Sequence, residues 1–241
     1  MKLFLSVLFV LGSQSFAQNV SKFQVNVFAA KESNVNAFVL TDSMGTVIVD
    51  ATRNSTEAKL LAEFARTKGK DPKVIFITHG HPDHYVGMVA LKKEFPNAQI
   101  VVANAQIRDD ILGFTRFMES KGWLDGEPAV KEKTAKNPNG FDYNSIQVLA
   151  GNKLIMPAGA ELDVLTDFPL SEAAHETLLY SKDLNALFAS DLVYNKVHLW
   201  MGIGVSREAA ANWKSELGKL NSKYANQKIT IYPGHGPKTD S

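Results

Sequence analysis

The sequence of 241 residues contains no cysteine. This absence excludes disulfide bonds, thiolate metal ligands and a lipid anchor attached to a cysteine. A chain without thiols suits an oxidising compartment, where a stray thiol is a liability. A metal site in this protein must therefore use residues other than cysteine as ligands.

An excess of charge of either sign is also lacking. The chain has 26 basic and 25 acidic side chains, and its formal net charge is +1. Proteins that bind nucleic acid usually show a basic patch or stripe, and no such pattern is present. Short charged runs such as Lys131–Lys133 are typical of solvated surfaces. We therefore expect a small-molecule partner and no nucleic acid.

Long apolar runs are scarce as well. The longest extends from Leu3 to Leu11, which is short of the about 20 residues that a transmembrane helix needs. Lys2 precedes it, and small and polar residues ending at Ala17 follow it, in the order found in secretory signal peptides. The alternative is a buried first strand or helix. The pattern predicts a signal peptide at residues 1–17 and a periplasmic or secreted domain at 18–241, without membrane anchoring after cleavage.

The most informative stretch is Thr78–Gly87, which reads THGHPDHYVG and holds three of the six histidines. A β-branched and aromatic run, Lys73–Ile77, predicts a strand directly before it, and helical spacing of apolar residues follows it. A loop between a strand and a helix can turn these side chains toward one point. Imidazoles with a carboxylate are ligands that a cation such as Zn²⁺ prefers, whereas a plain surface turn seldom needs three imidazoles. The candidate ligands are His79, His81, Asp83 and His84.

The order of strand and helix patterns predicts the architecture. Strand patterns occur in two runs, one before residue 103 and one after residue 144, and each run is closed by helical patterns. This order favours an α/β (α+β) fold with two mixed sheets packed face to face and helices on the outer faces, a four-layer αββα sandwich. An insert at residues 104–144 begins with an amphipathic helix and continues as a polar, irregular segment. We expect this insert near the mouth of the active site.

At this point the chain resembles the metallo-β-lactamase superfamily, because five motifs occur in the order of that family. These are Asp50 at a strand end, the histidine cluster, His175, Asp191 after the apolar strand Leu187–Ser190, and His235 in Pro233–Gly236. The resemblance implies a site for two Zn²⁺ ions. His79, His81 and His175 would bind one ion, Asp83, His84 and His235 the other, and Asp191 would bridge them. Asp50 would orient the metal loop without being a ligand.

The third motif departs from the usual pattern of the family, which reads Gly-His-Thr. Here His175 lies between Ala174 and Glu176. His198, seven residues after Asp191, is therefore the competing candidate for this ligand position. His198 could also be a residue of the pocket rather than a ligand.

The bridging aspartate constrains the chemistry that the resemblance implies. One major β-lactamase class has cysteine at the position of Asp191, and another has asparagine at the position of His79. The present pattern resembles instead the glyoxalase II-type thioesterases and the quorum-quenching lactonases. Tyr194 also resembles a lactonase tyrosine that hydrogen-bonds the carbonyl oxygen of the substrate, although an ordinary half-buried tyrosine would give the same pattern.

Together these features predict a metal-dependent hydrolase that attacks a small carbonyl compound with a metal-bound hydroxide. Asp83 would orient the nucleophile and pass its proton to the leaving group, and Tyr194 would help to polarise the carbonyl. An ester, a lactone, a thioester and a β-lactam present the same electrophilic carbon, so the substrate stays open. The alternatives are an iron-dependent relative, of the sulfur dioxygenase or diiron type, and a non-catalytic zinc-binding protein. The candidates for the pocket wall are Phe114, Phe117, Trp123, His198 and Trp200.

Overall fold

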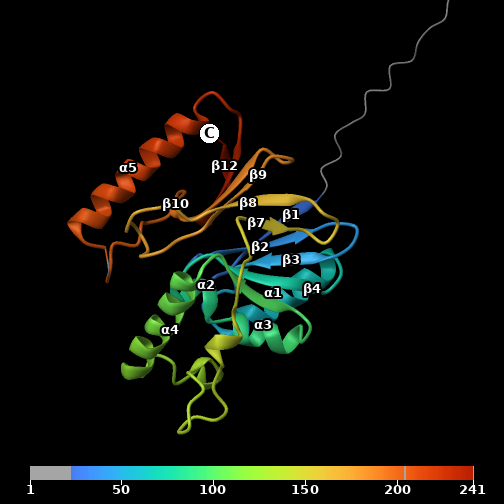
Figure 1. Cartoon of the computed structure of the whole chain (residues 1–241), viewed down its shortest axis with the longest axis vertical. Helices are drawn as coiled ribbons and strands as arrows, with labels where there is room; N and C mark the ends of the chain where they lie inside the picture. Colours follow the sequence, from blue (N-terminus) through green and yellow to red (C-terminus); the bar gives the residue numbers. More distant parts are fainter. Residues whose placement is uncertain (1–22, 204, 241) are drawn as a thin grey trace, which may run out of the picture.

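The computed structural model describes residues 23–203 and 205–240. The predicted signal peptide at residues 1–17 lies outside the described residues. Within the described part of the chain, no helix has the length and apolar character needed to cross a membrane. The strands form two six-stranded sheets, and the helices pack against these sheets (Figure 1).

The first sheet has the order β1-β2-β3-β4-β5-β6. Its first three strands are antiparallel neighbours, whereas β3, β4, β5 and β6 run parallel. Every residue of β2 and β3 is buried, because these strands are covered on both faces and consist almost entirely of apolar side chains. The strands are β1 (Gln24–Ala29), β2 (Asn36–Thr41), β3 (Thr46–Val49), β4 (Pro72–Ile77), β5 (Gln99–Val102) and β6 (Gln147–Val148).

The second sheet has the order β12-β11-β10-β9-β8-β7. Its strands β10 and β11 are parallel, and this pair has an antiparallel neighbour on each side. The strands are β7 (Lys153–Ile155), β8 (Glu161–Leu165), β9 (Leu178–Ser181), β10 (Ala186–Tyr194), β11 (Thr230–His235) and β12 (Thr239–Asp240).

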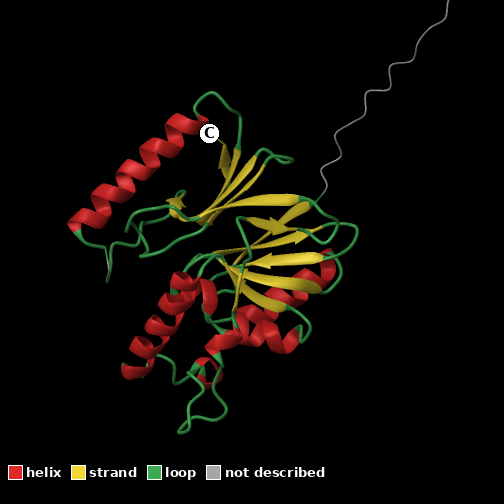
Figure 2. Ribbon diagram, in the orientation of Figure 1, coloured by secondary structure: helices red, strands yellow, loops and turns green. Residues whose placement is uncertain are grey.

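The helices lie on the outer faces of the two sheets (Figure 2). Helices α1 (Ser55–Lys68), α3 (Met88–Glu94) and α4 (Ala105–Ser120) accompany the first sheet, and α5 (Arg207–Tyr224) covers the second. The short helix α2 (Pro82–Tyr85) lies inside the stretch Thr78–Gly87, so Asp83 and His84 belong to a helical turn and not to the predicted loop. Two 3₁₀ helices, η1 (Pro128–Val130) and η2 (Tyr143–Ser145), interrupt the irregular part of the insert. The predicted αββα arrangement of two mixed sheets is confirmed.

Aromatic side chains join the two sheets. The ring of Phe38 on β2 contacts Phe188 on β10 and Tyr232 on β11, with centroids 5.2 and 5.8 Å away. These rings have edge-to-face arrangements, which are favourable beyond the burial of apolar area alone. The core between the sheets holds β4, β10 and β11 at fixed positions relative to each other, and the candidate site lies at the ends of these strands.

One strand differs from its predicted limits in a way that matters for the site. The sequence pattern places Asp191 after the apolar strand Leu187–Ser190, whereas β10 continues to Tyr194. Irregular pairing between β10 and β11 occurs around Ser190, which has a positive φ of 47°. This bulge bends the strand without ending it, so Asp191 is part of the sheet rather than of a loop.

Candidate metal centre

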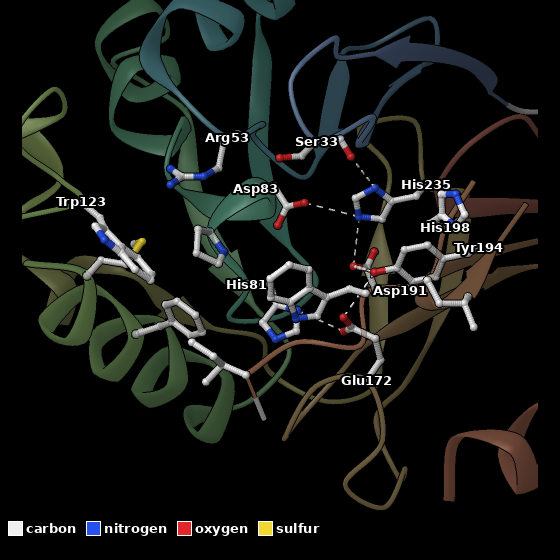
Figure 3. Close-up of a pocket in the computed structure, with 16 residues that line it drawn as sticks. Ser33, Arg53, His81, Asp83, Trp123, Glu172, Asp191, Tyr194, His198 and His235 are labelled. Carbon is white, nitrogen blue, oxygen red and sulfur yellow. Dashed lines mark hydrogen bonds and ion pairs between the residues drawn. The ribbon is translucent and has the colours of Figure 1, made fainter. Parts of the chain in front are cut away.

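Chemically active side chains from separate segments of the chain converge at one end of the two sheets (Figure 3). His79 follows β4, His81 precedes α2, and Asp83 and His84 belong to α2. Asp191 comes from β10 and His235 from the end of β11. They form two groups whose ligand atoms lie within 4.8 Å of one another: His79, His81, Glu172 and Asp191 in the first group, and Asp83, His84 and His235 in the second.

Glu172 is the member of the first group that sequence reasoning missed. It comes from the irregular segment between β8 and β9, and its side chain is buried. Its Oε2 lies 3.1 Å from Nδ1 of His81 and 3.9 Å from Nε2 of His79. A carboxylate is as acceptable a ligand for a divalent cation as an imidazole, so an acidic residue in the same segment as His175 was the available signal.

Asp191 lies between the two groups. Its Oδ2 is 3.8 Å from Nε2 of His79 in the first group and 3.1 Å from Nε2 of His235 in the second. Its Oδ1 is 3.1 Å from Nε2 of His84. A Cβ atom at Gly234 would collide with this carboxylate, so the β11 backbone can pass Asp191 only where it has no side chain. Asp191 therefore faces ligand atoms of both groups.

The second group is oriented by groups behind it. Oδ2 of Asp50 lies 2.8 Å from Nδ1 of His84, which leaves Nε2 of the same ring facing the cluster. Nδ1 of His235 lies 2.9 Å from the backbone oxygen of Ser33, and its Nε2 is 3.4 Å from Oδ2 of Asp83. A carboxylate or carbonyl behind an imidazole fixes the tautomer and the ring orientation, as is usual for histidine ligands of metals.

Asp50 also fixes the start of the metal loop, as its predicted supporting role requires. Its Oδ1 accepts a hydrogen bond of 2.9 Å from the backbone N–H of Thr78, and the Thr78 hydroxyl contacts both carboxylate oxygens. Oγ1 of Thr78 and Oγ of Ser190 lie 3.0 and 3.2 Å from Nδ1 of His79. The two fully buried imidazoles, those of His79 and His84, are therefore both held from behind by polar partners.

The protonation of the cluster is strongly perturbed. Burial lowers the pKa of His79 well below its usual range, and the nearby His84 adds to this effect. Burial would also lower the pKa of His84, but the carboxylates of Asp191 and Asp50 outweigh it and raise this pKa well above the usual value. Burial disfavours ionisation of Asp191, yet His84 and His235 hold the pKa of its carboxyl well below the usual range. Burial and the charge of Asp191 raise the pKa of Glu172.

Several buried polar atoms that face the cluster have no well-aligned hydrogen-bond partner among the described residues. They are Nε2 of His79, Nε2 of His84, Oε2 of Glu172 and Oδ1 of Asp191. Buried nitrogen and oxygen atoms in folded proteins are almost always paired, because an unpaired one costs about 1–3 kcal/mol. All four atoms are of the types that bind zinc, iron and manganese. The donor set and its geometry therefore fit one or two divalent cations.

Two histidines considered for the third ligand position lie outside both groups. His175 was expected to bind the first cation, but its side chain is 45% exposed and its Nδ1 lies 2.8 Å from Oδ2 of Asp110 on α4. The structure therefore places His175 at the rim and Glu172, three residues earlier, in the cluster. His198 is exposed and lines the pocket, which agrees with the alternative that it is a pocket residue and not a ligand.

Tyr194 contacts two carboxylates of the first group. Its hydroxyl donates a hydrogen bond of 2.8 Å to Oδ2 of Asp191, and its oxygen also lies 3.3 Å from Oε1 of Glu172. Its ring stacks on the imidazole of His235, with centroids 4.7 Å apart and an angle of 6° between the planes. Burial and the charge of Asp191 raise the pKa of this phenol, so it stays a neutral donor. The Tyr194 hydroxyl is thus already hydrogen-bonded to a carboxylate of the site, although the side chain also lines the cavity.

A cavity of about 460 Å³ opens directly above the cluster. Its floor includes His81, Asp83, Glu172, Asp191 and His235. Its walls include Phe114, Met118 and Trp123 from the insert and, from the segment after β10, His198, Leu199, Trp200 and Ile203. Phe117 packs behind Phe114 and Trp123 rather than lining the cavity, with ring centroids 5.7 and 5.6 Å away. The size is in the range of small-molecule sites.

Comparison with known proteins agrees with this geometry. Residues 30–108 match the family model of the metallo-beta-lactamase superfamily. A metallo-beta-lactamase family protein from Thermus thermophilus superposes with a TM-score of 0.64 at 18% identity, covering 92% of this chain and 75% of its own. The BLEG-1 B3 metallo-beta-lactamase gives 0.61 at 17% identity, covering 90% and 94%. A metallo-beta-lactamase from Pontibacter korlensis gives 0.57 at 18% identity, covering 90% and 88%.

No curated protein matches the sequence. The family match and the similar structures confirm the predicted resemblance to the metallo-β-lactamase superfamily, and they show that this chain has the metallo-β-lactamase fold. The family match ends at residue 108, so it includes the histidine loop and excludes Glu172, Asp191 and His235. The part of the site contributed by the second sheet therefore rests on the geometry of the chain itself.

Proposed function

We propose that this chain is a metal-dependent hydrolase that holds two divalent cations and cleaves the carbonyl group of a small ester, lactone, thioester or β-lactam. The observation that carries the proposal is the convergence of buried imidazoles and carboxylates from both sheets on one point beneath an open cavity, with Nε2 of His79 no closer than 3.8 Å to the carboxylates it faces. A cluster that served only to stabilise the fold would be expected to give Nε2 of His79 a hydrogen-bond partner as well.

The residues divide between the two cations according to the two groups. His79, His81 and Glu172 would hold the first, and Asp83, His84 and His235 the second. Asp191 faces both groups and would be shared. Its negative charge, together with those of Asp83 and Glu172, offsets the repulsion between two cations close together. This set differs from the predicted one by a single exchange, Glu172 for His175.

Two divalent cations in such a site lower the pKa of water and polarise a carbonyl oxygen. The chain supplies the rest of the chemistry. Asp83 lines the cavity and is partly exposed, so its carboxylate can accept a proton from water and deliver it to the leaving group. The apolar walls exclude bulk water and hold the substrate over the floor, which strengthens every electrostatic interaction there.

Tyr194 has a positioning role in this proposal. Its hydroxyl ties Asp191 to Glu172, and its ring supports His235, so it holds ligands from three segments in one arrangement. A hydrogen bond to the substrate carbonyl, as in the lactonase pattern, would require the hydroxyl to leave these carboxylates.

The open cavity argues against a purely structural zinc site, which is usually closed by four protein ligands. A second candidate function is favoured by Glu172. With this residue the site contains three carboxylates beside four imidazoles. Carboxylates suit harder cations such as manganese and iron, and imidazoles suit iron as well as zinc. A redox enzyme with two iron ions is therefore the alternative to a zinc hydrolase.

Export is part of the proposal. It is supported by the N-terminal signal-peptide pattern and by the absence of cysteine. A protein that acts outside the cytoplasm would meet its metal there and would act on small molecules of the periplasm or the medium.

The test combines metal content with turnover. The protein is stripped of metal, reloaded separately with Zn²⁺, Mn²⁺ or Fe²⁺, and analysed for bound metal and for hydrolysis of one ester, one lactone, one thioester and one β-lactam. We expect two metals per chain and chelator-sensitive hydrolysis of at least one class. His81→Ala should lose metal and activity, whereas His198→Ala, a cavity histidine outside both groups, should keep its metal. Oxygen consumption by the iron form without any hydrolysis would favour the redox alternative instead.

A further inference from the structure

The cavity contains a guanidinium group that the metal chemistry does not use. Arg53 lines the cavity and is half-buried. Three other arginines, Arg66, Arg108 and Arg116, pair with a carboxylate. Among the described residues, Arg53 has neither a hydrogen bond nor an ion pair of its own. A partly buried guanidinium without an anion is unfavourable, because its five N–H groups lose water and gain no partner.

The backbone that carries Arg53 is fixed against the metal loop. The N–H of Ala51 donates a hydrogen bond of 2.7 Å to the oxygen of His84, and the N–H of Gly87 donates one of 3.0 Å to the oxygen of Thr52. Asp50 and Thr52 have positive φ values of 64° and 70°. A β-branched residue in this region of φ is a strained outlier, and such strain is concentrated at functional sites. The chain thus holds Arg53 in a defined place beside the candidate ligands.

The walls of the cavity beside Arg53 are largely apolar. Phe114, Met118 and Trp123 line one wall, and Trp200 and Ile203 line another. Trp123 is 53% exposed and Trp200 is 51% exposed, so large apolar surfaces at the mouth are open to a ligand. Figure 3 shows Arg53 and Trp123 on one side of the cavity and Tyr194, His198 and His235 on the other. The guanidinium of Arg53 therefore lies across the cavity from the wall that holds Tyr194 and His198. The floor, on which the reacting group of the substrate would lie, is between them.

We propose that Arg53 determines specificity, by binding an oxyanion of the substrate such as a carboxylate or phosphate. This inference rests on the proposed hydrolase function and adds a substrate class to it: an amphipathic carbonyl compound with an apolar body and an anionic group away from the bond that is cleaved. The apolar body lies against Trp123 and Phe114. The oxyanion accepts hydrogen bonds from the guanidinium, whose planar fork matches the two oxygens of such a group.

The carboxylates of the cavity floor are not the missing anionic partner of Arg53. Asp83, Glu172 and Asp191 belong to the two metal-binding groups, and the described residues show no ion pair between any of them and Arg53. When two cations are bound, the floor no longer repels an anion strongly, and Arg53 is free to bind it. The opposite assignment, that Arg53 only balances the charge of Asp83, predicts no preference between anionic and neutral ligands.

The first experiment measures binding, so that it does not depend on turnover. 4-Phenylbutyrate, its neutral amide and 3-phenylpropylphosphonate are titrated into the zinc-loaded protein, with tryptophan fluorescence as the signal because Trp123 and Trp200 line the cavity. We expect an oxyanion to bind more tightly than the amide, and the two oxyanions to reveal whether carboxylate or phosphate is preferred. In Arg53→Gln this preference should fall about 10- to 100-fold, as for the loss of a charge-assisted hydrogen bond.

Arg53→Lys keeps the charge and loses the fork, so it should keep part of the preference. Arg66→Gln, a surface variant outside the cavity lining, is the matched control and should bind like the wild type. Thermal unfolding and zinc content are measured for every variant. An undiminished oxyanion preference in folded, zinc-loaded Arg53→Gln, or equal binding of amide and oxyanions by the wild type, overturns the inference.

The second experiment compares hydrolysis of the mono-p-nitrophenyl ester of adipic acid with that of its methyl ester, in which a neutral methoxycarbonyl group replaces the free carboxylate. We expect kcat/KM to favour the charged ester in the wild type and to lose this preference in Arg53→Gln. Arg53-dependent binding, without hydrolysis of these esters or of the lactone, thioester and β-lactam tested above, would leave the anion site standing and refute the hydrolase function. Hydrolysis of both esters that is unchanged in Arg53→Gln would support the hydrolase function and refute the anion site.

Discussion

Nδ1 of His81 lies 3.1 Å from Oε2 of Glu172, and this pair joins the metal loop of the first sheet to the segment between β8 and β9 of the second. The contact raises the pKa of His81, although burial alone would lower it. It also fills with a carboxylate the position for which the sequence motif indicates His175. If Glu172 is the ligand in place of His175, both the charge of the site and its preference among metals would differ from those that the motif implies.

The first prediction concerns this exchange of ligand. Glu172→Ala should remove one metal per chain and most of the turnover, since it deletes a buried ligand from the first group. His175→Ala should keep both metals, because His175 pairs with Asp110 at the rim. Elemental analysis of both variants, beside kcat, is the measurement. Full metal content in Glu172→Ala together with loss of metal in His175→Ala would restore the original assignment.

The second prediction concerns the shared ligand. Asp191→Ala should weaken the second metal more than the first, since the carboxylate lies 3.1 Å from both His84 and His235 but 3.8 Å from His79, and kcat should fall with the second metal. A carboxylate shared by cations about 3.5–4 Å apart offsets their repulsion, so its loss lowers mainly the affinity of the more weakly held cation. Asp191→Cys keeps a ligand that can be anionic and should recover part of the zinc binding. Two metals held tightly by the alanine variant would show that Asp191 is not shared.

The histidine loop could be predicted from sequence because all of its determinants are local. The strand before it, the helical pattern after it and the ligand types all lie between residues 73 and 91. The same holds for the supporting role of Asp50, which ends the neighbouring parallel strand β3 and hydrogen-bonds Thr78 at the end of β4. Parallel neighbours place the ends of their strands at one edge of a sheet, so adjacency in the fold follows from the order of the elements.

Glu172 could not be chosen over His175 in this way. The two residues are three positions apart in a segment without regular structure, and a segment of that kind has no periodicity that tells which side chain points inward. The choice depends on contacts made far along the chain, with His81, Tyr194 and Asp110. A motif centred on histidine therefore locates the segment, whereas the fold decides that Glu172 and not His175 lies in the cluster.

The third prediction concerns the walls of the cavity. Phe114→Ala and Trp123→Ala should change KM or the preference among substrates more than they change metal content, because both side chains line the cavity and neither belongs to a metal group. Phe117→Ala is the matched control, since that ring packs behind them and should affect mainly stability. Equal losses of stability in all three variants, with unchanged KM, would mean that the insert does not select substrates.

The last prediction concerns a chain of buried hydroxyl groups that ties α2 to the insert. The Tyr85 hydroxyl lies 2.9 Å from Oγ1 of Thr115 on α4, and this oxygen lies 3.0 Å from the Tyr143 hydroxyl, which donates to the oxygen of Val130. Burial raises the pKa of both phenols. Above pH of about 10 the unfolded chain therefore releases protons that the folded protein keeps, so stability is complete below that pH and decreases as pH rises.

Each of these phenols should contribute about 1.4 kcal/mol per pH unit to this decrease until its folded-state pKa is reached. Tyr143→Phe should lower the free energy of unfolding by about 1 kcal/mol at pH 8, through the lost hydrogen bonds. Above a pH of about 10, the free energy of unfolding of this variant should fall by about 1.4 kcal/mol per pH unit less than that of the wild type. Urea unfolding of the wild type and the variant at several pH values between about 8 and 11, on either side of the ordinary tyrosine pKa, measures both effects. A variant that is destabilised equally at every pH would show that Tyr143 ionises in the folded protein as readily as in the unfolded chain. In that case the insert would be less tightly packed against α2 than these contacts indicate.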